Sequence, residues 1–221
     1  MIKIENIKKE YGRKIILRNV SIKSEEGKCI GILGSNGSGK STLLKILAGI
    51  IKGDDGIFSF NGTDLLKNIK RRSEIIGYVP QNTPLFEELS ARDNLRLWYS
   101  KTELKRQLEN GMLSLLELTD FIDTPVCKLS GGMKKRLSIG CAVSRTPRIL
   151  IMDEPSAALD IVCKEKIISY LQMYKASGGT VIIATHDIRE IFMCDNLYIL
   201  KNGDTVPYEF DGNLDRLAGS L

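Results

Sequence analysis

One short segment near the start of the chain has the residue types and spacing of a phosphate-binding loop. Residues 34–41 read Gly-Ser-Asn-Gly-Ser-Gly-Lys-Ser, which fits the pattern G-x-x-x-x-G-K-[ST]. The glycines allow backbone N–H groups to turn inward around an anion. In this pattern Lys40 reaches the β- and γ-phosphates of a nucleotide, and the hydroxyl of Ser41 binds Mg²⁺. The segment therefore predicts a nucleotide site built from Gly34, Ser35, Asn36, Gly37, Ser38, Gly39, Lys40 and Ser41.

Two adjacent acids follow a short apolar run in the second half of the chain. Residues 149–152 are Ile, Leu, Ile and Met, and Asp153 and Glu154 come directly after them. An acid at the carboxyl end of a buried strand lies where open α/β sheets bind ligands. Asp153 can hold Mg²⁺, and Glu154 can polarise an attacking water molecule. The alternative, that both acids only cap a strand end, is weak because they are adjacent.

A second glycine-containing helix start lies at residues 129–133, Leu-Ser-Gly-Gly-Met. Ser130 can cap a helix there, while Gly131 and Gly132 leave backbone N–H groups uncovered. Lys134, Lys135 and Arg136 follow at once, and cations in a first helical turn oppose the helix dipole by some tenths of a kcal/mol each. We therefore expect an anion bound at this helix start to offset the repulsion.

The elements that must position these residues follow from hydrophobic periodicity and turn chemistry. Strands are predicted at 2–7, 20–23, 28–33, 57–60, 75–79, 148–152, 180–185, 196–200 and 205–208. Helices are predicted at 40–48, 90–98 with Ser90 as the cap, 102–118 with Thr102 as the cap, 130–145, 160–174 and 187–194. Strands and helices alternate at both ends of the chain, whereas the middle shows helical periods alone, so we predict an α/β fold with a helical insertion.

Composition limits the partners of this protein. The chain has 221 residues and a net charge of +5, and its short basic runs are typical of solvated faces, so no nucleic-acid partner is expected. No apolar run approaches the roughly 18 residues of a membrane helix, and the N-terminus lacks a signal-peptide core. We expect a cytoplasmic protein with reduced cysteines, and its single histidine, His186, excludes a multi-histidine metal site.

These motifs together resemble the nucleotide-binding subunits of ATP-binding cassette (ABC) transporters, over essentially the whole chain. The family has a Walker A loop, a Q-loop glutamine, a signature motif, a Walker B strand with a catalytic glutamate, a D-loop and a switch histidine. In this sequence the Walker A loop corresponds to 34–42, which includes Thr42, and the Q-loop glutamine corresponds to Gln81 in Tyr-Val-Pro-Gln. The signature motif corresponds to 129–132, the Walker B strand with its glutamate to 149–154, the D-loop to 156–160 and the switch histidine to His186. Tyr11 resembles the aromatic residue that stacks on adenine. Ala158 departs from the family, because D-loops often have glycine at that position.

The resemblance implies a P-loop NTPase core with a parallel sheet, a small N-terminal antiparallel β subdomain and an inserted α-helical subdomain. We predict one domain over 1–221, with the core in 1–84 and 146–221 and the helical subdomain in 85–145. The implied cofactors are ATP and Mg²⁺. Glu154, His186 and Gln81 would be catalytic, and Ser41, Gln81 and Asp153 would hold the metal.

The resemblance also implies a head-to-tail homodimer. Each ATP would lie between one chain's Walker A loop and the partner's Ser130, Gly131 and Gly132, with Asp160 contacting across the interface. A separate membrane-spanning permease would place the chain at the inner face of the cell membrane. The apolar segment around Phe86 and Trp98 would either receive that permease or form the core of the helical subdomain.

Two functions remain open at this point. The first is the ATPase subunit of a transporter, and the Gly-Gly-Met wording of the signature resembles exporters more than importers. The second is a soluble ABC ATPase without a transport role, such as one for metallocluster assembly, which has a single cassette of similar size. A P-loop kinase does not explain residues 129–132.

Overall fold

The computed structural model describes residues 1–157 and 159–221. Ten strands in these residues form one sheet, in the order β5-β4-β1-β2-β10-β9-β3-β8-β7-β6. Five neighbouring strands are parallel, and every residue of the central three is buried because helices cover both faces. They are β9 (Asn196–Lys201), β3 (Cys29–Leu33), β8 (Thr180–Ala184), β7 (Ile149–Asp153) and β6 (Ile76–Val79).

The other half of the sheet is largely antiparallel. It contains β1 (Ile2–Tyr11), β2 (Lys14–Ser24), β4 (Asp55–Phe60), the two-residue β5 (Thr63–Asp64) and β10 (Asp204–Tyr208). β10 forms an antiparallel hairpin with β9 and joins β2 through one parallel pair, Asp204 with Asn19. The predicted fold class, a P-loop NTPase core with an N-terminal antiparallel part, is confirmed.

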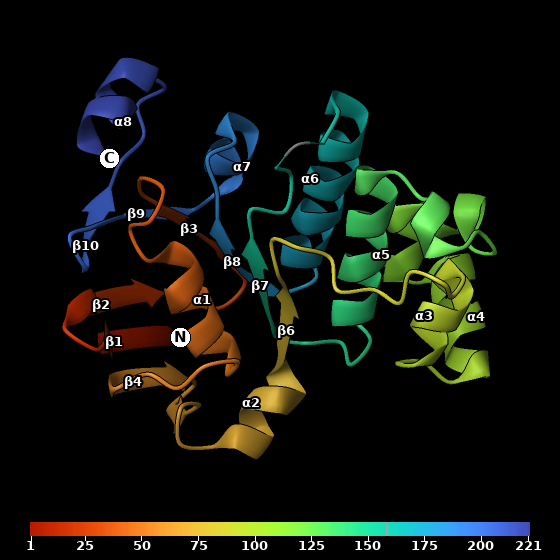
Figure 1. The fold of residues 1–221 in the computed structure, drawn as a ribbon, viewed down its shortest axis with the longest axis horizontal. Coiled ribbons are helices and arrows are strands. Elements are labelled where there is room, and N and C mark those ends of the chain that lie inside the picture. The colour runs from red at the N-terminus through yellow and green to blue at the C-terminus, as the bar shows by residue number, and fades with distance from the viewer. Residues whose placement is uncertain (158) are drawn as a thin grey trace.

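Helices cover the sheet and extend it to one side (Figure 1). Around the sheet lie α1 (Lys40–Ala48), α2 (Ile69–Ile75), α6 (Ile161–Ala176), α7 (Ile188–Met193) and α8 (Leu214–Ser220). On the far side gather α3 (Ala91–Arg96), α4 (Lys101–Asn110) and α5 (Gly131–Ala142), with 3-10 turns at Met112–Leu116, Leu118–Phe121 and Val126–Lys128. These last elements occupy the segment predicted as a helical subdomain; the domain boundaries themselves stay a prediction.

One helix boundary was predicted wrongly. Ser100, not Thr102, caps α4 by accepting a hydrogen bond from the Glu103 N–H. The helix ends at Asn110 because Gly111 has extended backbone, so the predicted helix to Leu118 becomes a short helix followed by 3-10 turns. The predicted caps Ser90 and Ser130 are confirmed. Short α2 and α8 had not been predicted.

The sheet separates two hydrophobic cores. Leu150 and Met152 of β7 face the core shared with the helices α3 to α6, whereas Ile149 and Ile151 face the core shared with α1 and β1. Such a strand must be apolar on both faces, which is why residues 149–152 are a continuous apolar run and not an alternating one. The acids that follow this strand are therefore fixed at the edge of a rigid centre.

The close approach of β6 to α5 gives a prediction for stability. A Cβ at Gly77 would lie 2.6 Å from the Ala142 carbonyl oxygen and 3.0 Å from the Pro147 side chain. We expect Gly77→Ala to lower the free energy of unfolding by about 1–3 kcal/mol, because backbone must shift to admit the methyl group. Gly219→Ala is the control, since its Cβ would meet no atom within 4 Å. Urea unfolding measures both, and an unchanged midpoint for Gly77→Ala would show that β6 and α5 can separate freely.

Candidate nucleotide-binding and hydrolysis site

The phosphate loop joins β3 to α1 and depends on left-handed backbone. Gly34 has φ 155° and a Cβ there would lie 2.5 Å from the Leu200 carbonyl oxygen. Gly39 has φ 108° and forms the N-cap of α1 without a side-chain cap. L-residues rarely adopt these values, so glycine is required at both positions. The first N–H groups of α1 thus face the loop and are available to an anion.

Lys40 points back into its own loop. The side chain is 5% exposed, and Nζ donates to the carbonyl oxygens of Gly34 at 2.6 Å and Ser35 at 3.2 Å. Burial lowers the pKa of Lys40, while the negative charges of Glu154 and Asp153 raise it. The ammonium group is therefore fixed beside the loop and next to two acids, where a phosphate can replace the carbonyl oxygens as its partner.

The loop borders a pocket of about 410 Å³ that brings together four distant parts of the sequence. Most of the predicted loop residues contribute to it, with Gln81 and Glu154, whereas Gly34, Ser35 and Ser38 do not line it. Its lining consists of Ile16, Asn36, Gly37, Gly39, Lys40, Ser41, Thr42, Gln81 and Glu154. Ile16, from β2, was missed by sequence analysis, because an apolar residue within a strand gives no signal that could have indicated it.

Asp153 and Ser41 fit a magnesium site. Asp153 ends β7, is 2% exposed, and its Oδ1 has no hydrogen-bond partner, which is costly for a buried carboxylate. Burial raises the pKa of Asp153, and a hydrogen bond with Ser41 and the positive charges of Lys45 and Lys40 lower it. A hydroxyl beside an unpartnered carboxylate oxygen is a donor set that Mg²⁺ accepts. Within residues 1–157 and 159–221, no group of three or more His, Cys, Asp or Glu could hold a metal. Metal binding by Gln81 stays a prediction, and phosphate and water would supply the other ligands.

Two of the predicted catalytic side chains converge on the carboxylate of the third. Gln81 Nε2 donates to Glu154 Oε2 at 3.1 Å, and His186 Nε2 lies 3.5 Å from Glu154 Oε1. Glu154 has φ 46°, a left-handed value that costs a non-glycine residue roughly 1–3 kcal/mol. Its N–H donates to the Ala184 carbonyl oxygen at 2.9 Å, which holds the strained residue beside β8. Burial and the charge of Lys40 lower the pKa of His186, while Glu154 raises it, so the ring is neutral at pH 7.

A buried acid that had not been predicted binds the residue before His186. Glu190 of α7 is fully buried, and its Oε2 accepts a hydrogen bond from the Thr185 hydroxyl, next to His186. Burial raises the pKa of Glu190 to about 7. Glu190 stands between Arg189 and Ile191 in a short helix, and this local sequence gives no signal that the acid is buried.

The signature segment, residues 129–133, lies at the start of α5, where Ser130 and Gly131 are exposed and Leu129 and Gly132 are buried. Ser130 Oγ accepts a hydrogen bond from the Met133 N–H at 3.2 Å. A Cβ at Gly131 would meet only Leu159, at 3.9 Å, whereas one at Gly132 would lie 2.3 Å from Cys163 Sγ. Gly132 thus allows α5 to approach α6, while Gly131 leaves the helix start open. No described residue of this segment lines the phosphate-loop pocket, and α5 and α1 lie apart with strands of the sheet between them (Figure 1).

Each of the three cations after the signature segment has an acceptor within the protein, so their positions do not by themselves indicate a bound anion. Anion binding at Ser130, Gly131 and Gly132 stays a prediction. Lys134 Nζ donates to the Glu87 carboxylate at 2.8 Å, and Arg136 donates to the Leu116 carbonyl oxygen at 2.9 Å. Lys135 donates to backbone carbonyl oxygens of the Q-loop. The cost of their position is thus offset within the protein, because each side chain reaches an acceptor on another segment.

Two further predicted contacts lie outside the phosphate-loop pocket. Tyr11 is 52% exposed, with Lys9 Nζ 5.2 Å from its ring centroid. Asp160 is the N-cap of α6 and accepts a hydrogen bond from the Cys163 N–H at 2.8 Å. Adenine stacking by Tyr11 and a cross-dimer contact by Asp160 stay predictions. Ala158, the predicted departure in the D-loop, lies outside the described residues.

Comparisons with known proteins agree with this geometry. The family model described as ABC transporter matches residues 17–157. The linearmycin resistance ATP-binding protein LnrL of Bacillus subtilis is 34% identical, over 99% of this chain and 72% of its own length. The lantibiotic transport ATP-binding protein SrtF of Streptococcus pyogenes is 32% identical, over 98% of this chain and 95% of its own length. A probable sulfate/thiosulfate import ATP-binding protein of Chlorella vulgaris is 35% identical, over 93% of this chain and 89% of its own length.

A solved structure gives the same result for the fold. The ATP-binding cassette MJ0796, as a dimer in a post-hydrolysis state with ADP and phosphate, matches with a TM-score of 0.83 and 31% identity. The match covers 96% of this chain and 100% of that one. In the described part of the chain, no helix has the length and apolar character needed to cross a bilayer. The family match agrees with the phosphate loop, with the side chains around Glu154 and with the start of α5. We conclude that the chain belongs to the ABC transporter family, as an ATP-binding subunit.

Proposed function

We propose that the chain hydrolyses ATP to power a membrane transporter, and that it closes as a head-to-tail dimer around two ATP molecules. The observation that carries this proposal is the separation of two complementary half-sites. One half is the pocket around Lys40, which the described residues leave open to solvent. The other is the exposed helix start at Ser130 and Gly131, which has no part in that pocket. A two-fold arrangement completes both sites at once and leaves no open end.

ATP binding follows from the phosphate loop. The N–H groups of the loop and of the first turn of α1 surround the β- and γ-phosphates, and Lys40 pairs with their charge. Ser41 and Asp153 would hold Mg²⁺, which neutralises charge on the phosphates when bound. Thr42, at the rim of the same pocket, and Tyr11, on the nearby strand β1, would complete the nucleotide site.

Hydrolysis follows from the group around Glu154. Its carboxylate accepts a proton from an attacking water molecule as the water approaches the γ-phosphate. Gln81 and His186 fix the carboxylate from two sides, and neutral His186 can donate a hydrogen bond to the γ-phosphate. When the γ-phosphate is lost, contacts to Ser130 of the second chain are lost with it, and the dimer opens.

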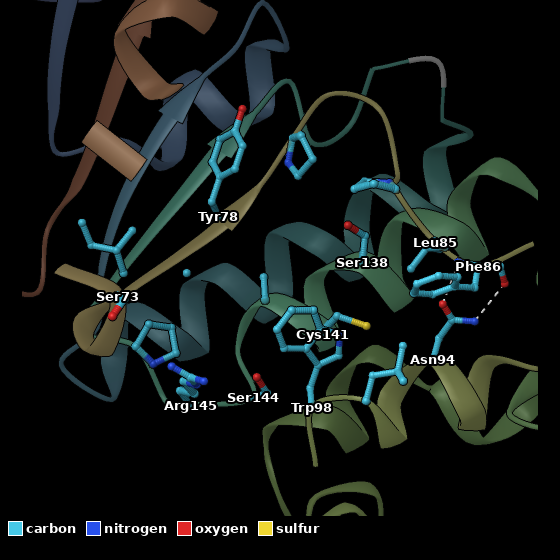
Figure 2. Close-up of a pocket in the computed structure, with 17 residues that line it drawn as sticks. Ser73, Tyr78, Leu85, Phe86, Asn94, Trp98, Ser138, Cys141, Ser144 and Arg145 are labelled. Atoms are coloured by element: carbon cyan, nitrogen blue, oxygen red, sulfur yellow. Dashed lines mark hydrogen bonds between the residues drawn. The ribbon is translucent and has the colours of Figure 1, made fainter. Parts of the chain in front are cut away.

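The permease partner has a suitable surface. A groove of about 330 Å³ lies between β6, α3 and α5, and Phe86 and Trp98 are 59% and 57% exposed beside it (Figure 2). Asn94 fixes the segment by bonding both the N–H and the carbonyl of Phe86, at 2.9 Å and 3.1 Å. Exposed aromatic residues beside a fixed backbone are typical docking features, and we propose that a short helix of the permease binds here. Tyr99, by contrast, is buried and serves the helical core.

Export is the direction that we propose. The sequence Gly-Gly-Met at 131–133 supports export. The likeness to a resistance protein and to a lantibiotic transport protein supports export as well. The chain would then lie at the inner face of the cell membrane, in the cytoplasm. A soluble ABC ATPase without a permease is the second candidate, and it would leave the groove without a partner.

The first prediction concerns Glu154. Glu154→Gln should bind ATP but hydrolyse it about 100-fold more slowly or worse, because the water loses its proton acceptor. Size-exclusion chromatography with ATP and Mg²⁺ should then show a stable dimer. Adding Ser130→Arg to the same chain should keep it monomeric, since the new cation would occupy the place of the second chain's γ-phosphate. A dimer that survives Ser130→Arg would exclude the head-to-tail arrangement.

The second prediction concerns Lys40. Lys40→Ala should weaken ATP binding about 10- to 100-fold, because charge-assisted hydrogen bonds to phosphate contribute roughly 1.5–3 kcal/mol. Isothermal titration calorimetry measures this on the monomer. Lys134→Ala, a control with the same loss of charge on α5, should leave the affinity unchanged. Equal ATP affinity in both variants would place the phosphates elsewhere.

The third prediction concerns the groove. The double variant Phe86→Ser, Trp98→Ser should lose binding to the permease, because aromatic anchors contribute about 2 kcal/mol each at such interfaces. Its ATPase activity without the permease should stay within about twofold of the parent, because neither residue lines the phosphate-loop pocket. Ile69→Ser is the control, as an exposed apolar residue on α2 away from the groove. Co-purification from membranes reports the partner, and retention by the double variant would move the docking site.

A further inference from the structure

One lysine of the signature helix is buried against the Q-loop. Lys135 is 4% exposed, and its Nζ donates to the backbone carbonyl oxygens of Pro80 at 3.0 Å and Gln81 at 2.8 Å. Burial lowers its pKa, which Asp153, Glu190 and Glu154 oppose. A buried ammonium group needs such partners, so the position of the Q-loop and the position of Lys135 are tied together.

The neighbouring lysine shows that this contact is specific. Lys134 reaches the Glu87 carboxylate, a charged group that is 48% exposed. Lys135 instead binds two neutral carbonyl groups of the backbone. Because both acceptors are consecutive residues, one ammonium group fixes the direction of the chain at the point where Gln81 leaves β6.

Gln81 thereby has two different attachments. Its carbonyl oxygen binds Lys135 of α5, and its side-chain amide binds Glu154 at 3.1 Å. Helix α5 connects Ser130 to Lys135, and hydrogen bonds lead on from Lys135 to Gln81 and from Gln81 to the Glu154 carboxylate. Such a series can carry coupling when its members move together between two arrangements.

The two ends of this series belong to different ATP sites in the proposed dimer. Ser130 would contact the ATP held by the second chain, whereas Glu154 would act on the ATP held by its own chain. We propose that Lys135 is a positioning residue that couples the two ATP sites, so that closure of one site on the signature segment places Gln81 and Glu154 for hydrolysis in the other. This inference rests on the head-to-tail dimer proposed above.

The experiment compares Lys135→Met with Lys135→Gln and Lys134→Met. Methionine fills the space without donating, glutamine can still donate to one carbonyl, and Lys134→Met removes the same charge one residue away. The first measurement is binding of a fluorescent ATP analogue to the monomer. The second, made in the Glu154→Gln chain, is the ATP concentration that gives half-maximal dimer. The third is the Hill coefficient of ATPase activity in the chain with Glu154 present.

Lys135→Met should leave analogue binding to the monomer within about twofold while raising the ATP concentration for half-maximal dimer roughly fivefold or more. Its Hill coefficient should fall from near the number of sites, about 2, towards 1. Lys135→Gln should lie between Lys135→Met and the parent, and Lys134→Met should match the parent. A purely structural lysine would instead lower thermal stability without changing the Hill coefficient.

Parental dimerisation and a parental Hill coefficient in Lys135→Met would overturn the inference. If that variant does not fold, the same two measurements on Lys135→Gln decide, and parental values there also overturn it. The proposed function has a separate test. If Glu154→Gln alone stays monomeric with ATP, the dimer is wrong, whereas a normal dimer with unaltered cooperativity in the Lys135 variants removes only the coupling role.

Discussion

The junction between β3 and α1 is the constraint on which the site depends. Left-handed backbone at Gly34 and Gly39 turns the chain so that α1 starts directly above the end of its own strand. Because β3 lies between β8 and β9, and β7 is next to β8, the carboxyl ends of these parallel strands meet at one edge. Lys40, Asp153, Glu154 and His186 all lie at this edge for that reason. The chemistry is thus a consequence of strand order more than of any single side chain.

The monomer holds this site in a poised state. Asp153 is buried with an unpartnered oxygen, Lys40 is buried against neutral carbonyl oxygens, and Glu154 has strained backbone. Each of these features costs free energy in the isolated chain, and each would be relieved by a phosphate, a metal ion or a positioned water. These features therefore lower the stability of the isolated chain, and the same groups are positioned to bind the nucleotide.

Sequence analysis predicted the motifs well because each motif is local. The phosphate loop needs particular glycines, the Ser130 and Ser90 caps need short polar side chains, and residues 149–152 must be apolar on both faces. The helix capped at Ser100 was placed two residues late, since Ser100 and Thr102 are both good caps and Gly111 was not taken as a stop. Ile16 was missed because the pocket that it lines is formed by residues distant in sequence, and Glu190 was missed because nothing in Ile188–Met193 marks the acid as buried. The acceptors of Lys134, Lys135 and Arg136 lie on segments distant in sequence, so the sequence alone could not show that these cations are already paired.

The segment from Gln81 to Phe86 links the phosphate-loop pocket, which Gln81 lines, to the groove, which Phe86 lines. Five residue steps of extended chain span at most about 18 Å, so the ATP-facing end and the groove-facing end cannot move independently by more than a small amount. Lys135 holds one end through the Gln81 carbonyl, and Asn94 holds the other through both backbone groups of Phe86. A permease helix that displaces Phe86 would thus pull on the same backbone that positions Gln81 beside Glu154. Because Lys135 and Asn94 both belong to the helical part of the chain, rotation of that part would move both ends together. In the proposed function, binding of a permease at the groove would reach Glu154 by this route.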